Sequence, residues 1–301
     1  MRLEKRKKES AGLQSKGQGT DRIRMENRMQ DKWQVRLLGT RGSMATTGRA
    51  YESFGGDTLS VELTIGDIVI FLDAGTGIMH GRAGAKNHIL IGHPHLDHLI
   101  GLSKWNELAD PSKRMTIYMA EHEGMTCEEI LHRLYGPPFW PVSLEMVSKG
   151  LRYVTLGSER GIMPKTAAFE IGGIRVETMK GNHPGGVTHF KLSDGKRTLV
   201  YAVDCELTKE AFPELKEFAR NSDLLICDGQ LLEEDSASKR GWGHSTASEA
   251  ARLGEECGAR QTVLVHYDPD STDEILEELS ESMAVEYPHC AFGRQGEVRF
   301  I

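Results

Sequence analysis

The stretch His93-Pro94-His95-Leu96-Asp97-His98 follows directly on the apolar run Ile89-Leu90-Ile91. It sets four groups that can bind metal ions within six residues, at the end of a predicted strand. Side chains alternate along an extended segment, so His93 and His95 point to the same side. Asp97 and His98 follow where the chain turns, and can face a second ion. A single histidine there would be an ordinary polar residue at the end of a strand. Four metal-binding residues within six positions instead predict a metal site.

Three more ligand-type residues stand at the ends of predicted strands. His183 follows the strand-like run 174–178, Asp204 follows the apolar run 199–203, and His266 follows the run 262–265. An open α/β scaffold presents its chemistry at such strand ends. Each residue alone could be a cap or a turn. Together with the first motif they predict a two-metal site, in which one carboxylate bridges both ions.

The order of these motifs resembles the metallo-β-lactamase superfamily, from about Val35 to the C-terminus. The resemblance implies an α/β fold, an αββα sandwich with a dinuclear metal site. By position, it implies one metal held by His93, His95 and His183, a second held by Asp97, His98 and His266, and Asp204 as the bridge. Leu72-Asp73-Ala74-Gly75-Thr76-Gly77 is similar to the family's early glycine-rich turn, in which the aspartate, here Asp73, supports the metal ligands. Imidazole and carboxylate ligands suit Zn²⁺, with Mn²⁺ or iron as alternatives.

The segment Gly243-His244-Ser245-Thr246 narrows the resemblance to a phosphodiesterase branch that includes ribonuclease Z. Thr246 and Glu249 match a capping box, which predicts a helix that begins there and ends at Gly258. The start of a helix favours an anion such as phosphate. We therefore expect His244 to be catalytic, giving a hydrogen bond or proton to the substrate. The alternative is that His244 only packs beside the cap.

One feature departs from ribonuclease Z. That family carries a long substrate-gripping arm between the ligands that correspond to His183 and Asp204. Here these residues are only 21 positions apart, and Ser193-Asp194-Gly195-Lys196 predicts a hairpin turn between them. A ribonuclease Z-like RNA endonuclease is therefore an alternative that we do not favour, and a nucleic acid is a less favoured partner than a small phosphodiester.

The resemblance implies hydrolysis by a metal-activated hydroxide, with Asp97 as a second catalytic residue that orients the water. Metal-binding histidines need partners for their other ring nitrogens, and Asp73 or Asp228 can supply them. The segment 136–142 carries Phe139 and Trp140 and is stiffened by prolines. These two aromatics either lie over the metal site and stack on a substrate ring, or fill a gap between a loop and the core.

Two other functions remain open at this stage. A lactone or thioester hydrolase would use the same metals, and would be insensitive to loss of His244. A non-enzymatic sensor would bind a ligand or a redox metal at the site without turnover, so it is excluded by turnover that Asp204→Ala abolishes.

Composition favours a cytoplasmic enzyme. Residues 1–32 hold ten Lys or Arg and five Asp or Glu, a charge of +5 that leaves −12 for residues 33–301. We expect a charged, disordered tail followed by one hydrolase domain over 33–301; the alternatives for the tail are an arm that binds nucleic acid, or an upstream stretch before the true start at Met25 or Met29. No apolar run reaches the roughly 18 residues of a membrane helix. The five cysteines contain no C-x-x-C pair, which fits a reducing cytoplasm. A homodimer is compatible with this composition.

Hydrophobic patterning predicts two β-rich halves with helices on their outer faces. Strands are expected near 34–38, 58–64, 68–72, 88–92, 115–119, 151–155, 166–179, 187–192, 197–203, 223–227, 261–266 and 297–301. Helices are expected near 98–106, 124–134, 207–219, 245–257 and 271–285. Within the last helix, Leu276, Leu279 and Met283 recur at helical spacing and are expected to face the core.

Overall fold

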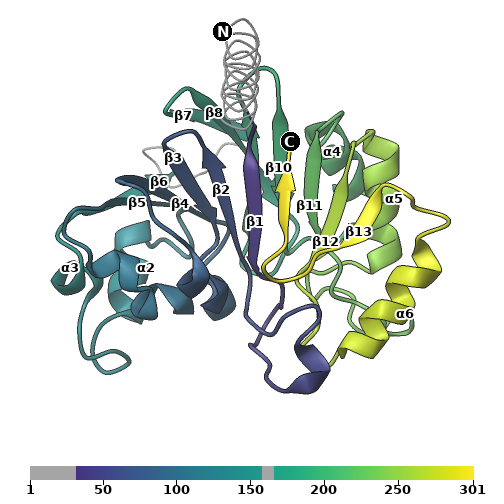
Figure 1. Ribbon diagram of the computed structural model, residues 1–301, viewed down its shortest axis with the longest axis horizontal. Coiled ribbons are helices and arrows are strands. Elements are labelled where there is room, and N and C mark those ends of the chain that lie inside the picture. Colours follow the sequence, from purple (N-terminus) through teal and green to yellow (C-terminus); the bar gives the residue numbers. More distant parts are fainter. Residues whose placement is uncertain (1–31, 158–165) are drawn as a thin grey trace, which may run out of the picture.

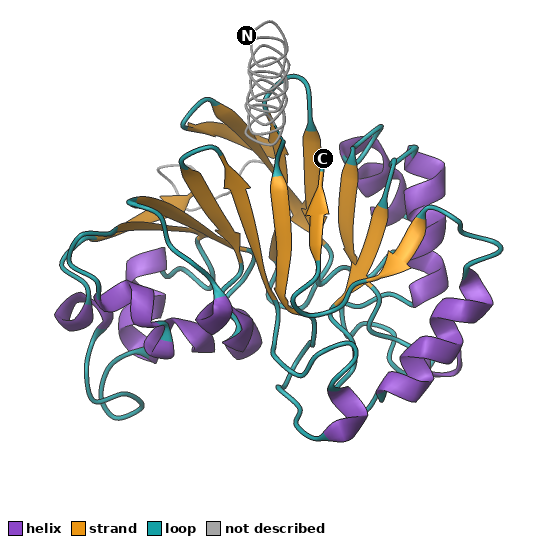
Figure 2. Cartoon of the chain, viewed as in Figure 1, coloured by secondary structure: helices purple, strands orange, loops and turns teal. Residues whose placement is uncertain are grey.

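Two facing β-sheets form the centre of the molecule, and helices cover the outer face of each (Figure 1). The computed structural model describes residues 32–157 and 166–301, so the predicted tail lies almost entirely outside the described residues. Figure 2 shows the resulting layers of helix, sheet, sheet and helix. The predicted αββα sandwich is therefore confirmed.

Each sheet has seven strands within the described residues. The first sheet has the order β14-β1-β2-β3-β4-β5-β6, and the second has the order β13-β12-β11-β10-β9-β8-β7. The bounds in the first sheet are β1 Gln34–Gly39, β2 Ser60–Ile65, β3 Ile68–Leu72, β4 Lys86–Ile91, β5 Arg114–Ala120, β6 Leu151–Leu156 and β14 Val298–Phe300. The bounds in the second sheet are β7 Thr166–Ile171, β8 Ile174–Gly181, β9 Val187–Ser193, β10 Thr198–Ala202, β11 Leu224–Asp228, β12 Thr262–Val265 and β13 Cys290–Phe292.

The helices divide between the two outer faces. Helices α2 (Cys127–Leu134) and α3 (Leu144–Val147) lie outside the first sheet, and α4 (Ala211–Phe218), α5 (Ala247–Cys257) and α6 (Asp273–Met283) lie outside the second. Short 3₁₀ segments complete the fold: η1 Arg49–Tyr51, η2 Thr76–His80, η3 Leu96–His98, η4 Ile100–Lys104, η5 Asn106–Ala109 and η6 Glu233–Asp235. None of the helices in the described ranges is long and apolar enough to cross a membrane.

Strand alternation explains the three hydrophobic layers. In β3, Ile70 and Leu72 face the core between the sheets, whereas Val69 and Phe71 face the layer beneath α2. A third layer packs the second sheet against α4, α5 and α6. It includes Leu276 and Met283, with Leu279 packed against it, so the predicted core face of α6 is confirmed.

Two expected elements differ from the structure, and two others were not expected. The helix expected near 98–106 is replaced by η3, η4 and η5. The single strand expected over 166–179 is the hairpin β7–β8, whose turn residues Gly172 and Gly173 have φ of 56° and 86°. Only glycine adopts two such angles at little cost, as in a type I′ turn. Strand β13 and helix α3 were not expected.

Helix α5 has the ends that the sequence predicted. The Thr246 hydroxyl accepts a hydrogen bond from the Glu249 amide, and the Glu249 carboxylate accepts one from the Thr246 amide. Gly258 ends the helix in the left-handed conformation, with φ 73°. This start fixes the loop that carries His244, two residues before Thr246.

Candidate metal centre

All seven predicted ligands meet between the two sheets, at strand ends. The motif of residues 93–98 follows β4, while His183, Asp204 and His266 follow β8, β10 and β12. Asp204 lies at the middle of the group. Its carboxylate oxygens are 3.2 Å from His93 Nε2, 3.3 Å from His98 Nε2, 3.5 Å from His183 Nε2 and 3.0 Å from His266 Nε2.

The seven residues form two groups whose ligand atoms lie within 4.8 Å of one another. One group contains His93, His95, His183 and Asp204, and the other contains Asp97, His98 and His266. This is the division that the family resemblance implied. The first group is open on one side because His95 is exposed, whereas Asp97, His98 and His266 are buried. Solvent and substrate therefore reach the centre from the side of His95.

Hydrogen bonds outside the group fix which ring nitrogens face inward. His98 Nδ1 donates to Asp73 Oδ2 at 2.8 Å, and His266 Nδ1 donates to Gln230 Oε1 at 3.0 Å. Their Nε2 atoms then carry lone pairs, yet they lie only 3.2 Å apart. Asp97 Oδ2 is 3.2 Å from each of these two nitrogens. Lone pairs and carboxylate oxygens this close repel one another unless a cation, or a proton, lies among them.

Burial and nearby carboxylates shift the pKa values of these histidines in opposite directions. Burial alone would lower the pKa of His266, but the carboxylates of Asp204, Asp97 and Asp228 together outweigh burial and raise that pKa to about 10. Burial likewise opposes a charge on His98, but the carboxylates of Asp97, Asp204 and Asp73 together outweigh burial, so the pKa of His98 lies well above the ordinary value. In the other group, burial lowers the pKa of His93 and of His183 and keeps these rings neutral. A neutral imidazole is the form that binds metal.

Unsatisfied polar atoms also fit a cation. Among the described residues, both ring nitrogens of His93 and Asp204 Oδ1 are buried without a hydrogen bond. Buried polar atoms nearly always have partners in folded proteins. A divalent ion would satisfy His93 Nε2 and Asp204 together, so the donor set fits a metal.

The backbone is strained at the same strand ends. Asp73, Asp204 and His266 have φ of 57°, 57° and 65°, in the left-handed region that non-glycine residues seldom occupy. Each lies at the point where a buried strand stops and its side chain must turn toward the centre. Such strain collects at functional sites because the surrounding packing holds it in place.

A model of the "Beta-lactamase superfamily domain" matches residues 70–267, a range that contains all of these residues. The chain belongs to this superfamily. Ribonuclease Z of Brevibacillus brevis is 27% identical over 297 residues, covering 80% of this chain and 86% of the relative. The metallo-beta-lactamase fold protein YhfI from Bacillus subtilis has a TM-score of 0.67 at 19% identity, covering 90% of this chain and all of that one. A diphosphatase of the PhnP family has a TM-score of 0.65 at 16% identity, covering 90% and 97%. Membership of the superfamily and the two His/Asp groups together indicate divalent metal binding.

Asp73 has the supporting position that the sequence suggested. Besides His98, its carboxylate accepts hydrogen bonds from the Tyr201 hydroxyl at 2.7 Å and from the Gly92 amide at 2.7 Å. Tyr201 and Gln230 were not singled out from the sequence. They lie 128 and 36 positions from the residues they hold, so no local pattern points to them.

Asp228 has a different role from the one expected. Its Oδ2 accepts a hydrogen bond from His244 Nδ1 at 2.7 Å, so it orients His244 and none of the predicted ligands. The His244 ring stacks on His266 at 5.2 Å between centroids and meets the edge of His183 at 5.1 Å. Four groups, on Asp204, Asp228, His244 and His266, also lie within 4.8 Å of one another. His244 therefore contacts both halves of the centre, with Nε2 as the nitrogen left for chemistry.

The two aromatic residues of the proline-stiffened segment differ in how far they are buried. The Phe139 side chain is 76% exposed, whereas Trp140 is half-buried and packs edge-on against Tyr135, 6.0 Å between ring centroids. The expectation that both fill a gap to the core is wrong for Phe139.

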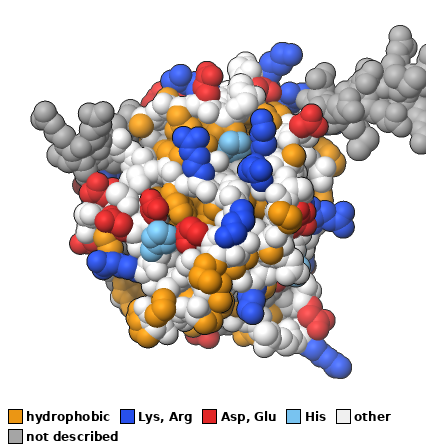
Figure 3. Space-filling model, turned by 90° about the vertical axis from the view of Figure 1, so that its left-hand side faces the viewer, with side chains coloured by type: hydrophobic (Ala, Val, Ile, Leu, Met, Phe, Trp, Pro, Cys, Tyr) orange, Lys and Arg blue, Asp and Glu red, His pale blue; other side chains and the backbone are white. Residues whose placement is uncertain are grey.

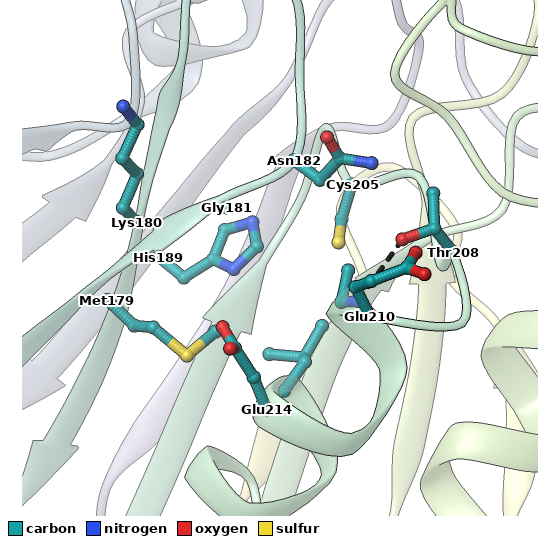
Figure 4. A pocket seen from close by; sticks show the side chains of 11 residues that line it. Met179, Lys180, Gly181, Asn182, His189, Cys205, Thr208, Glu210 and Glu214 are labelled. Atoms are coloured by element: carbon teal, nitrogen blue, oxygen red, sulfur yellow. Dashed lines mark hydrogen bonds between the residues drawn. The ribbon is translucent and has the colours of Figure 1, made fainter. Parts of the chain in front are cut away.

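A separate cavity of about 620 Å³ opens behind the centre, between β8, β9 and helix α4 (Figure 4). His189 lies at its base, where burial lowers the pKa of the imidazole to about 4. A Cβ atom on Gly181 would come within 2.4 Å of this ring, so glycine is required there. Asn182 and Cys205, which line the cavity, are the chain neighbours of His183 and Asp204.

Proposed function

We propose that this protein is a metal-dependent phosphodiesterase with two divalent ions, which we expect to be Zn²⁺. The observation that carries the proposal is the pair of ligand groups joined by Asp204, with His244 held against both. His93, His95 and His183 would hold one ion, Asp97, His98 and His266 the other, and Asp204 would bridge them. When bound, the ions supply a nucleophilic water of lowered pKa and offset charge on the phosphoryl oxygens.

His244 is the residue that we assign to proton transfer. Asp228 is fully buried, and its carboxylate accepts a hydrogen bond from His244 Nδ1, which fixes the orientation of the ring. Nε2 can then give a proton to the departing oxygen or donate a hydrogen bond to the phosphate. His244 also stands two residues ahead of α5, whose free amide groups favour an anion.

Asp97 has a second function in this proposal. Its Oδ2 accepts a hydrogen bond from the Ser43 amide at 2.8 Å and faces the two imidazoles of the second group. The rings of His98 and His266 and the Ser43 amide hold the carboxylate still, so it can orient the attacking water as well as bind metal.

The relatives favour phosphodiester chemistry over lactone or thioester hydrolysis. The relative from Brevibacillus brevis is named ribonuclease Z, and one structural neighbour is a diphosphatase. RNA is therefore a second candidate substrate. Against it, β9 and β10 form a direct hairpin where ribonuclease Z carries its arm, and the body of the chain is acidic. We propose a small phosphodiester as the substrate.

We also propose a compartment, a domain extent and an oligomeric state for the enzyme. All five cysteines are free and four of them are buried, which fits a reducing compartment such as the cytoplasm. We propose residues 33–301 as one hydrolase domain, with a homodimer as the state to test by light scattering.

Hydrolysis of bis-p-nitrophenyl phosphate tests this function. The purified protein would be stripped of metal, then reloaded with Zn²⁺ or Mn²⁺, and turnover followed at each stage. We expect activity that disappears and returns with metal, and that His244→Ala lowers without loss of metal. Activity toward lactones or thioesters alone, unaffected by His244→Ala, would contradict the proposal.

A further inference from the structure

An apolar groove begins at the metal-binding motif itself. It encloses about 500 Å³ and is lined by Leu96, Ile100, Met125, Phe139 and Trp140, with Arg133 as its charged residue. Leu96 stands between His95 and Asp97 in the chain, and its side chain is 59% exposed. The groove is thus continuous with the loop that carries two candidate ligands. Figure 3 shows hydrophobic side chains gathered toward the lower part of the face that looks outward from the first sheet.

The segment that forms the far wall is fixed to the same loop. The buried Tyr135 hydroxyl donates a hydrogen bond to the Leu99 carbonyl, next to His98. Trp140 packs edge-on against the Tyr135 ring. These contacts hold the aromatic segment beside the metal-binding loop, while Phe139 stays 76% exposed at the groove edge.

Exposing Phe139 and Leu96 to water has a cost that a bound apolar group would remove. The Leu, Ile, Met and Phe side chains of the groove offer no hydrogen bonds, and the Tyr135 hydroxyl already donates to Leu99, so the Trp140 indole and Arg133 are the donors that remain. A nucleobase could stack there, but the lining has no carboxylate or amide side chain to accept hydrogen bonds from its polar edge. An alkyl or aryl group needs no such partner. Arg133 at the rim suits the negative charge of a phosphodiester.

We propose that this groove binds the apolar arm of the substrate, so that the natural substrate is a phosphodiester carrying an alkyl or aryl group of several carbons. The inference rests on the proposed function, because it assumes that the phosphoryl group sits at the metal centre. Phe139 and Leu96 then determine specificity without taking part in the chemistry.

A series of n-alkylphosphonates tests this assignment as competitive inhibitors of bis-p-nitrophenyl phosphate hydrolysis. The phosphonate binds at the metal centre and the chain extends into the groove. Each buried methylene is expected to lower the inhibition constant about fourfold until the groove is filled. Calorimetric titration of the same compounds gives a readout that does not depend on turnover.

Phe139→Ser is the test variant, and Met146→Ser is its matched control. Both residues are exposed, at 76% and 68%, and both belong to the region after α2, but Met146 does not line the groove. Phe139→Ser should weaken octylphosphonate about tenfold and leave methylphosphonate unchanged. Met146→Ser should change neither compound.

The outcomes separate this inference from the proposed function. Inhibition by methylphosphonate with no dependence on chain length would overturn the groove assignment alone. Loss of octylphosphonate affinity in both variants would also overturn it. Weakened turnover of a short RNA by Phe139→Ser, with the alkyl series unaffected, would assign the groove to a base instead. No turnover of any phosphodiester by protein with both ions bound would contradict the proposed function itself.

Discussion

Asp73→Asn is the substitution that tests most sharply how the metal centre is supported. The Asp73 carboxylate accepts three hydrogen bonds, from His98 Nδ1, the Tyr201 hydroxyl and the Gly92 amide, and the residue is 1% exposed. Asparagine tolerates the left-handed backbone at this position and has the same shape. Its NH₂ group, however, must face one of these three donors. The change therefore removes at least one acceptor from a buried donor while keeping the fold.

The size of the effect follows from these contacts. Loss of a hydrogen bond to a charged group costs about 1.5–3 kcal/mol. At about 1.4 kcal/mol for each factor of ten, this weakens binding of the ion held by His98 by roughly 10- to 150-fold. This range agrees with the loss of metal affinity, commonly about 10- to 100-fold, that follows when a metal-binding histidine loses its hydrogen-bond partner.

Competition with a chromophoric chelator measures the affinity of the protein for each of the two ions. Asp194→Asn is the matched control, because this carboxylate accepts hydrogen bonds from the Lys196 and Arg197 amides and the Trp33 indole, in a hairpin away from the ligands. It should lower the melting temperature without changing metal affinity. If folded Asp73→Asn protein bound both ions within about twofold of the native affinity, the supporting role of Asp73 would be wrong.

The remaining predictions concern the bridge, the acid, the pH dependence and the core. Asp204→Ala should lower the metal content to one ion or fewer per chain and abolish turnover, as measured by elemental analysis and hydrolysis rates. His244→Ala should keep both ions but lower kcat by about 10²- to 10⁴-fold, and unchanged kcat would exclude proton transfer by this ring. Because the pKa of His266 is raised to about 10, binding an ion must displace a proton, so metal affinity should rise from pH about 6 to about 9. Calorimetry in two buffers of different ionisation enthalpy should detect that proton release. Leu276→Ala, 2% exposed, should cost about 2–5 kcal/mol in unfolding free energy, whereas Val285→Ala, 92% exposed, should stay within about 0.5 kcal/mol.

The positions of the ligands could be predicted because each depends on a local pattern. A buried strand followed by one polar residue is visible in the sequence before Asp204 and His266, and an alternating strand leads to the turn that carries His183. The start and end of α5 were also predictable, since Thr246, Glu249 and Gly258 form caps with partners only three or four residues away. These patterns fixed where the site lies in the chain.

The partners of the ligands were harder to predict, because they come from distant strands. Gln230 and Tyr201 reach the centre only through the pairing of β10, β11 and β12, which no short motif encodes. Asp228 was noticed, but its contact with His244 depends on the end of β11 meeting the loop before α5 in space.

The segment after His98 shows a second limit. Its apolar spacing predicts an α-helix, but a Cβ atom on Gly101 would come within 2.0 Å of the Gly75 carbonyl oxygen. The chain packs against the turn at Gly75 so closely that it forms short 3₁₀ segments. Tertiary contact here overrides local helical preference.

Metal content and phosphodiesterase turnover, measured on the same preparation through stripping and reloading, decide whether this protein is a two-metal phosphodiesterase. We predict two ions per chain, and hydrolysis of bis-p-nitrophenyl phosphate that rises with the second ion and is lost in Asp204→Ala. A folded protein that binds two ions and hydrolyses no phosphodiester would contradict it.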